Sequence, residues 1–77
     1  MGMERTARIH VPVHDLDCGE ARILERALAA AYGVLSAHVN PATETAYVEV
    51  DPAELDGWGV AQIIARAGFQ PGRPVET

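Results

Sequence analysis

The sequence has no lysine, a single cysteine, few aromatic residues and no apolar run long enough to cross a bilayer. Six unclustered arginines stand against eleven Asp and Glu, giving a formal net charge of -5. Phosphate backbones and anionic membranes are poor partners for such a surface. The N-terminus also lacks the pattern of a signal peptide. We therefore expect a cytoplasmic protein that binds no nucleic acid and does not insert directly into a membrane.

The single cysteine, Cys18, excludes an internal disulfide. It is therefore a buried hydrophobic residue, a reactive thiol or a metal ligand. Its neighbours Asp17, Gly19 and Glu20 are unlike the surroundings of a core residue. This context favours the role of a metal ligand.

The spacing of apolar residues predicts both strands and helices. Apolar and polar residues alternate over residues 8–13, 35–40 and 46–50, which predicts three strands. In the second of these, Leu35, Ala37 and Val39 are expected on the buried face. Apolar residues spaced three and four apart over 24–31 and 60–67 predict two helices, ended by Gly33 and Gly68, with Asp56 as the N-cap of the second.

With a short last strand at residues 69–73, the order is strand, helix, strand, strand, helix, strand. This order predicts an α+β fold, the ferredoxin-like βαββαβ sandwich, with a four-stranded antiparallel sheet and two helices on one face. The folded domain is expected at residues 8–73, between a flexible N-terminus (1–7) and a flexible C-terminus (74–77). His10, His38 and Tyr47 should lie on the helix-free face. Whether Trp58 covers the core edge or forms a contact surface stays open.

The second half of the chain carries a family resemblance. The residues concerned are Gly33-Val34, Ala37-His38-Val39-Asn40, Thr43 to Val50, Asp51-Pro52 and Ala67-Gly68-Phe69. They resemble the heavy-metal-associated (HMA) domain of soft-metal chaperones and metal-pumping P-type ATPases. The resemblance covers the folded part, residues 8–73, and implies the same ferredoxin-like fold.

In that family, the loop between the first strand and the first helix carries Gly-Met-x-Cys-x-x-Cys, whose two thiolates bind the metal. The corresponding loop here is residues 14–21, with Leu16 at the Met position, Cys18 at the first cysteine and no second cysteine. The spacing from Cys18 to Gly33 is one residue shorter than in the family. Asp17-Cys18 followed by Glu20 is similar to a variant found in zinc, cadmium and lead pumps, and so implies divalent cations more than copper.

Coordination chemistry agrees with this implication. Zn²⁺ and Cd²⁺ accept thiolate, carboxylate, imidazole and water together, whereas Cu(I) prefers two sulfur ligands. A Cu(I) site would therefore need Cys18 from two chains, in a metal-bridged homodimer. The single thiol also allows a disulfide-bridged homodimer through Cys18. The candidate ligands are Cys18, Asp17 and Glu20, with His14 as a further donor, although Asp17 is equally suited to cap the helix and Glu20 to complement its dipole. Metal binding should release a proton from Cys18.

Two functions remain open. The chain is either a metal-binding domain that holds Zn²⁺, Cd²⁺ or Pb²⁺ weakly and passes it to a metal-transporting ATPase, or a degenerate HMA-fold module that acts in protein interaction or regulation. A partner with a basic patch would suit the acidic surface in either case. An enzyme is not expected, because Asp15 to Glu20 would repel the phosphate that ferredoxin-like hydrolases bind after their first strand.

Overall fold

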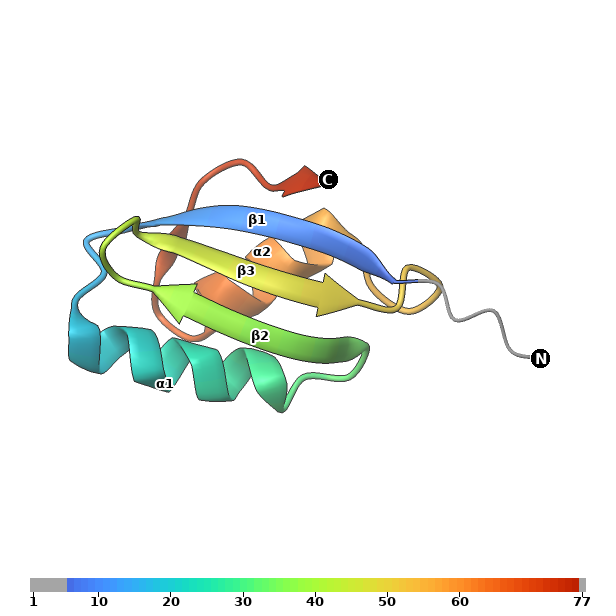
Figure 1. Cartoon of the computed structure of the whole chain (residues 1–77), viewed down its shortest axis with the longest axis horizontal. Coiled ribbons are helices and arrows are strands. Elements are labelled where there is room, and N and C mark those ends of the chain that lie inside the picture. Colours follow the sequence, from blue (N-terminus) through green and yellow to red (C-terminus); the bar gives the residue numbers. More distant parts are fainter. Residues whose placement is uncertain (1–5, 77) are drawn as a thin grey trace.

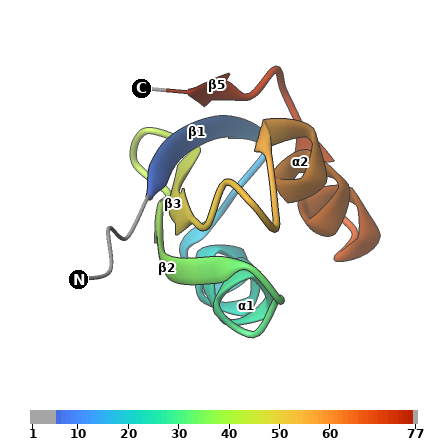
Figure 2. The ribbon, with the colours of Figure 1, turned by 90° about the vertical axis from the view of Figure 1, so that its right-hand side faces the viewer.

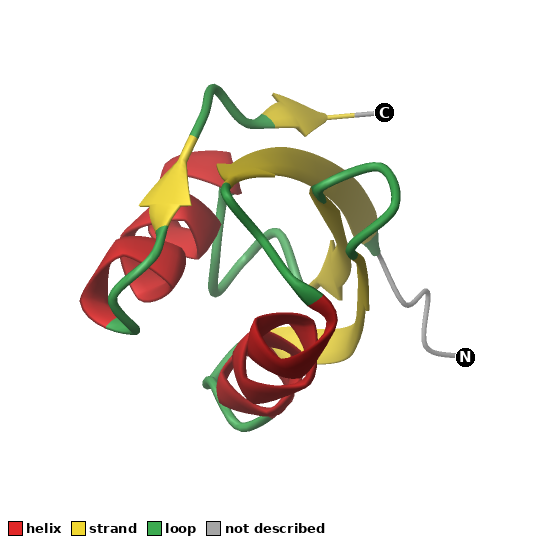
Figure 3. Ribbon diagram, turned by 90° about the vertical axis from the view of Figure 1, so that its left-hand side faces the viewer, coloured by secondary structure: helices red, strands yellow, loops and turns green. Residues whose placement is uncertain are grey.

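The computed structural model describes residues 6–76, and its order of elements confirms the predicted fold. The elements are β1 (Ala7–His14), α1 (Cys18–Ala29), β2 (Val34–Asn40), β3 (Thr45–Val50), α2 (Gly57–Arg66), β4 (Gln70–Pro71) and β5 (Val75–Glu76) (Figure 1). The strands form one antiparallel sheet in the order β2-β3-β1-β4. Both helices cover the same face of this sheet, and the other face is left open (Figures 2 and 3). No helix in residues 6–76 is long and apolar enough to span a membrane.

The core lies between the sheet and the two helices. Every second residue of β1 points into it, so Ile9, Val11 and Val13 are almost fully buried. Leu24 and Leu28 of α1 and Val60 and Ile64 of α2 are fully buried against them. Burial of each such side chain contributes about 1.5–3 kcal/mol to stability. The fully buried residues are all aliphatic, and Phe69 packs against them while partly buried.

The prediction that Leu35 faces the core is wrong. A β-bulge between Val34 and Ser36 shifts the pairing of β2 with β3 at this point. A bulge adds one residue to a strand and so reverses the faces on either side of it. Leu35 is therefore 56% exposed, and Val34 packs partly against the core in its place.

Strand structure is present on both sides of the expected boundaries of 8 and 73. Ala7 is already part of β1 and is buried, while residues 1–5 lie outside the described part of the chain. The expected last strand is reduced to β4, but the chain then returns to the same edge of β1 as β5, where Val75 pairs with His10. Between the two strands the Gly72 amide donates to the Pro12 carbonyl at 2.7 Å. Strand structure on this edge of β1 therefore continues to residue 76, beyond the expected boundary at residue 73.

Local signals place both helices, but Gly33 does not end α1 as predicted, because α1 ends at Ala29 with Ala30 as its C-cap. Gly68 directly follows Ala67, the C-cap of α2. Asp56 is the N-cap of α2, because its carboxylate accepts a hydrogen bond from the Gly59 amide at 2.8 Å. Gly33 and Gly68 follow the helices with φ of 91° and 98°, a backbone region that favours glycine. Helix α1 is tied to the edge of the sheet, since Glu25 accepts from the Val39 amide of β2 at 3.0 Å.

Candidate metal centre

The connection from β1 to α1 is held in place by a buried leucine. Strand β1 ends at His14, Asp15 turns the chain with a φ of 55°, and Leu16 is then buried in the core. Leu16 stands where the resembled motif has methionine, and it serves as an apolar anchor there. Because Leu16 is fixed, the residues that follow it leave the core at a defined point and enter α1.

Asp17 and Glu20 form a capping box at the start of α1. The Glu20 amide donates to Asp17 Oδ1 at 2.7 Å, and the Asp17 amide donates to Glu20 Oε1 at 3.3 Å. Such reciprocal bonds satisfy two amides that have no partner within the helix. The helix-capping role that the sequence allowed for Asp17 is therefore present, and Glu20 takes part in it.

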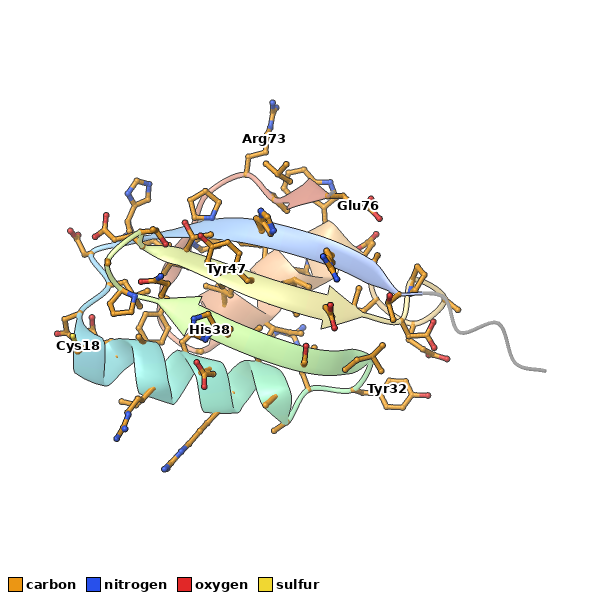
Figure 4. All side chains as sticks on the ribbon, in the orientation of Figure 1. Cys18, Tyr32, His38, Tyr47, Arg73 and Glu76 are labelled. Atoms are coloured by element: carbon orange, nitrogen blue, oxygen red, sulfur yellow. The ribbon has the colours of Figure 1, made fainter. Side chains whose placement is uncertain are left out.

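Cys18 is the first residue of α1, and its free thiol is exposed. It lies at one end of the molecule and not beneath the helices (Figure 4). This placement meets the condition on which the metal-ligand hypothesis depends, since a thiol packed in the core could not reach a cation from solvent. Thiolates at a helix N-terminus are also favoured by the unpaired amides and the helix dipole.

The candidate ligands are neighbours along the chain but do not converge on one point. Asp17, Cys18 and Glu20 share the first turn of α1, while His14 is exposed at the end of β1, where it pairs with Gln70 of β4. Within residues 6–76, no three His, Cys, Asp or Glu side chains are grouped to hold a metal ion. The ligand roles of these four residues therefore stay predictions, and binding would require side chains to move.

A depression lies elsewhere, on the open face of the sheet. It has a volume of about 450 Å³ and is lined by residues of β1, β2 and β3. As expected, His10, Tyr47 and His38 lie on this face, in one row across three strands. The rings of His10 and Tyr47 meet edge to face with centroids 4.8 Å apart, and His38 stacks more loosely at 6.3 Å.

Sequence reasoning missed two polar contacts beside this row. Arg8 Nε forms an ion pair with Glu49 Oε2 at 3.1 Å across β1 and β3, and the His38 imidazole Nδ1 lies 3.8 Å from Glu25 Oε1. The first pair follows from strand register, which alternation alone does not fix. The contact between His38 of β2 and Glu25 of α1 depends on how the helix packs on the sheet, which no sequence pattern predicts. Both contacts are largely exposed, so each contributes little to stability.

No family model and no curated protein sequence matches the chain, but solved structures do. The copper-binding domain of HMA7, a P-type ATPase, is 28% identical, with a TM-score of 0.84 over 91% of this chain and 96% of that domain. The Cu(I)-loaded N-terminal domain of a potential copper-translocating P-type ATPase from Bacillus subtilis is 26% identical, with a TM-score of 0.81 over 95% of this chain and 92% of that one. A protein solved in work on crosstalk between Cu(I) and Zn(II) homeostasis is 32% identical, with a TM-score of 0.77 over 84% of this chain and 94% of its own.

The chain belongs to the heavy-metal-associated domain family. In this chain the turn between β1 and α1 leads to Cys18, the exposed first residue of α1 at one end of the molecule (Figure 4). This HMA domain has one thiol there, so its coordination chemistry must differ from that of a domain with two.

Proposed function

We propose that this HMA domain binds a divalent cation of the zinc, cadmium or lead class through the Cys18 thiolate and the carboxylates of Asp17 and Glu20. The observation that carries the proposal is an exposed thiol at the start of α1, next in sequence to the capping residue Asp17 and two residues before Glu20. His14, exposed at the end of β1, is the candidate fourth donor. The cation would be cargo, held weakly in the cytoplasm and passed to a metal-transporting ATPase.

The capping box leaves oxygens available for a cation. The two capping bonds use Asp17 Oδ1 and Glu20 Oε1. Each carboxylate has a second oxygen, and among the described residues neither of these accepts a hydrogen bond. A cation could therefore share both carboxylates while the start of α1 stays capped. This arrangement favours the divalent reading, because Zn²⁺ and Cd²⁺ accept oxygen together with sulfur.

Copper requires a different arrangement. One sulfur per chain does not supply the two thiolates that Cu(I) prefers. Cu(I) would have to bridge Cys18 of two chains, or Cys18 and a thiolate of a partner protein. Loading with Cu(I) should therefore depend on protein concentration, whereas loading with Zn²⁺ or Cd²⁺ should not.

Titration with Co²⁺ tests the proposed ligand set. A sulfur-to-cobalt charge-transfer band should appear for the native chain and be absent in Cys18→Ala. Asp17→Asn and Glu20→Gln remove a negative charge but keep an oxygen that can accept the capping bond, so each should weaken Co²⁺ binding without unfolding α1. Asp56→Asn is the matched control, since it makes the same change at the N-cap of α2 and should leave Co²⁺ affinity unchanged.

The result of this titration also decides between two functions. The lack of a three-donor group among residues 6–76 favours the second candidate, an HMA-fold interaction or regulatory module without tight metal binding. Equal Co²⁺ spectra and affinities for the native chain and Cys18→Ala would refute the thiolate site and favour that second function. Loss of the band in Cys18→Ala with unchanged affinity in Asp17→Asn and Glu20→Gln would retain the thiolate but remove the carboxylates from the site.

A further inference from the structure

An exposed apolar pair lies at the turn between α1 and β2. Tyr32 is 80% exposed and Leu35 is 56% exposed. Together with Gly33, Val34, Asp51 and Glu54 they line a depression of about 210 Å³, which we name the Tyr32 corner. Large apolar side chains that share an exposed depression often mark a contact site. The corner lies at the end of the molecule opposite Cys18 (Figure 4).

Two backbone features give the Tyr32 corner a defined shape. The β-bulge between Val34 and Ser36 turns Leu35 out of the core and into the corner. Gly33 holds the turn against the segment after β3, because a Cβ there would lie 3.1 Å from the Cβ atoms of Glu54 and Leu55. Leu35 is thus exposed by a specific irregularity of the strand and not by fraying.

The charge of the Tyr32 corner is of one sign. Asp51 and Glu54 are the only charged residues among those that line the depression, and none of the described lining residues is basic. An apolar surface with an acidic rim is complementary to an apolar side chain flanked by a cation. We propose that the Tyr32 corner is a docking surface for a protein segment that carries an aliphatic or aromatic side chain beside arginine or lysine.

A second copy of the chain fits this surface poorly. Each chain has a net charge of -5 and would bring the same acidic rim to a symmetric contact. A basic segment of another protein avoids this repulsion. Because the corner and Cys18 lie at opposite ends, a partner bound there would leave the thiol accessible, so the domain could be held in place while its metal exchanges.

Three short peptides test the chemistry of the docking surface with the full chain. The first alternates Leu and Arg, the second replaces Arg by Glu, and the third replaces Leu by Ser. Only the Leu-Arg peptide should bind well, and it should shift the backbone amide signals of Gly33, Leu35 and Asp51 in nuclear magnetic resonance spectra. Equal binding of the Glu peptide, no binding of any peptide, or shifts confined to other regions would overturn the proposal.

Surface variants locate the binding energy. Tyr32→Ser and Leu35→Ser should each weaken binding of the Leu-Arg peptide about tenfold or more, as for central apolar contacts. Glu54→Gln should weaken it about two- to fivefold, as for one exposed charge. Ile23→Ser is the control, because Ile23 of α1 is 62% exposed and lies outside the corner. The affinity of this variant for the Leu-Arg peptide should equal that of the native chain.

Two results would refute the proposal. One is an equal loss of peptide affinity in Ile23→Ser, and the other is self-association of the native chain that Tyr32→Ser abolishes. Co²⁺ binding at Cys18 should be unaffected by these variants, which keeps this test separate from that of the metal site.

Discussion

Two glycines with similar backbone angles allow conformational strain to be separated from packing. Gly33 and Gly68 have φ of 91° and 98°, where an L side chain is strained. A Cβ on Gly68 would have no atom within 4 Å, whereas a Cβ on Gly33 would lie 3.1 Å from the Cβ atoms of both Glu54 and Leu55. Gly68→Ala therefore reports the backbone cost alone, and Gly33→Ala reports that cost plus a clash.

The expected magnitudes follow from this difference. A left-handed conformation costs a residue with a side chain about 1–2 kcal/mol, which is the loss expected for Gly68→Ala. Forcing an extra methyl group into a packed site costs about 1–3 kcal/mol more. The two atoms that oppose it are the first atoms of their side chains, so rotation of a side chain cannot remove the contact. Gly33→Ala should therefore lose about 2–5 kcal/mol in total.

Urea unfolding followed by circular dichroism measures both losses. The midpoint should fall with an unchanged slope, and each kcal/mol should lower the melting temperature by about 4–8 °C in a domain of this size. If Gly33→Ala and Gly68→Ala lost the same stability, the close approach of residues 54 and 55 to Gly33 would not exist in solution. A gain in stability for Gly68→Ala would contradict its backbone angle.

Other substitutions test the helices and the core by the same unfolding measurement. Gly19→Ala should stabilise the protein by about 0.4–1 kcal/mol, since Gly19 is the second residue of α1, has room for a methyl group, and alanine restricts the unfolded chain. A loss would contradict the helical assignment of residue 19. Asp17→Ala and Asp56→Ala should each lose about 0.5–2 kcal/mol through a missing N-cap, and cobalt spectra should then distinguish them, because only the first removes a proposed ligand. Leu24→Ala should cost about 2–5 kcal/mol because Leu24 is fully buried, and a smaller loss would indicate a looser core.

The fold could be predicted because most of its signals are local. Alternation in β1 and helical spacing around Leu24 and Val60 follow directly from which face is buried. The errors arose where a single residue changes the register. The bulge between Val34 and Ser36 exposes Leu35. No residue type in β2 indicates from the sequence that a bulge is present.

The end of the domain was missed for a related reason. Prolines at 71 and 74 suggest that a strand ends near them, and β4 ends at Pro71. The return of Val75 to the edge of β1 depends on hydrogen-bonding groups that β1 leaves free on that side, which is a property of the assembled sheet.

The candidate site was predictable in position but not in geometry. The polar neighbours of Cys18 indicated an exposed thiol, and the thiol is exposed. The capping box was only half anticipated, because whether Glu20 reaches back to the Asp17 amide depends on how α1 begins. Convergence of His14 with Cys18 depends on the turn at Asp15, whose positive φ the sequence does not reveal.

The bond from the Val39 amide to Glu25 has a consequence for behaviour at high concentration. Strand β2 is the outer strand of its side of the sheet, and outer strands invite pairing with other molecules because their amides seek acceptors. A carboxylate from α1 occupies one of these amides and places a negative charge where an approaching strand would have to lie. Replacing Glu25 by a neutral, shorter residue should therefore increase the fraction of the protein that aggregates during expression. The melting temperature of the soluble fraction should change little.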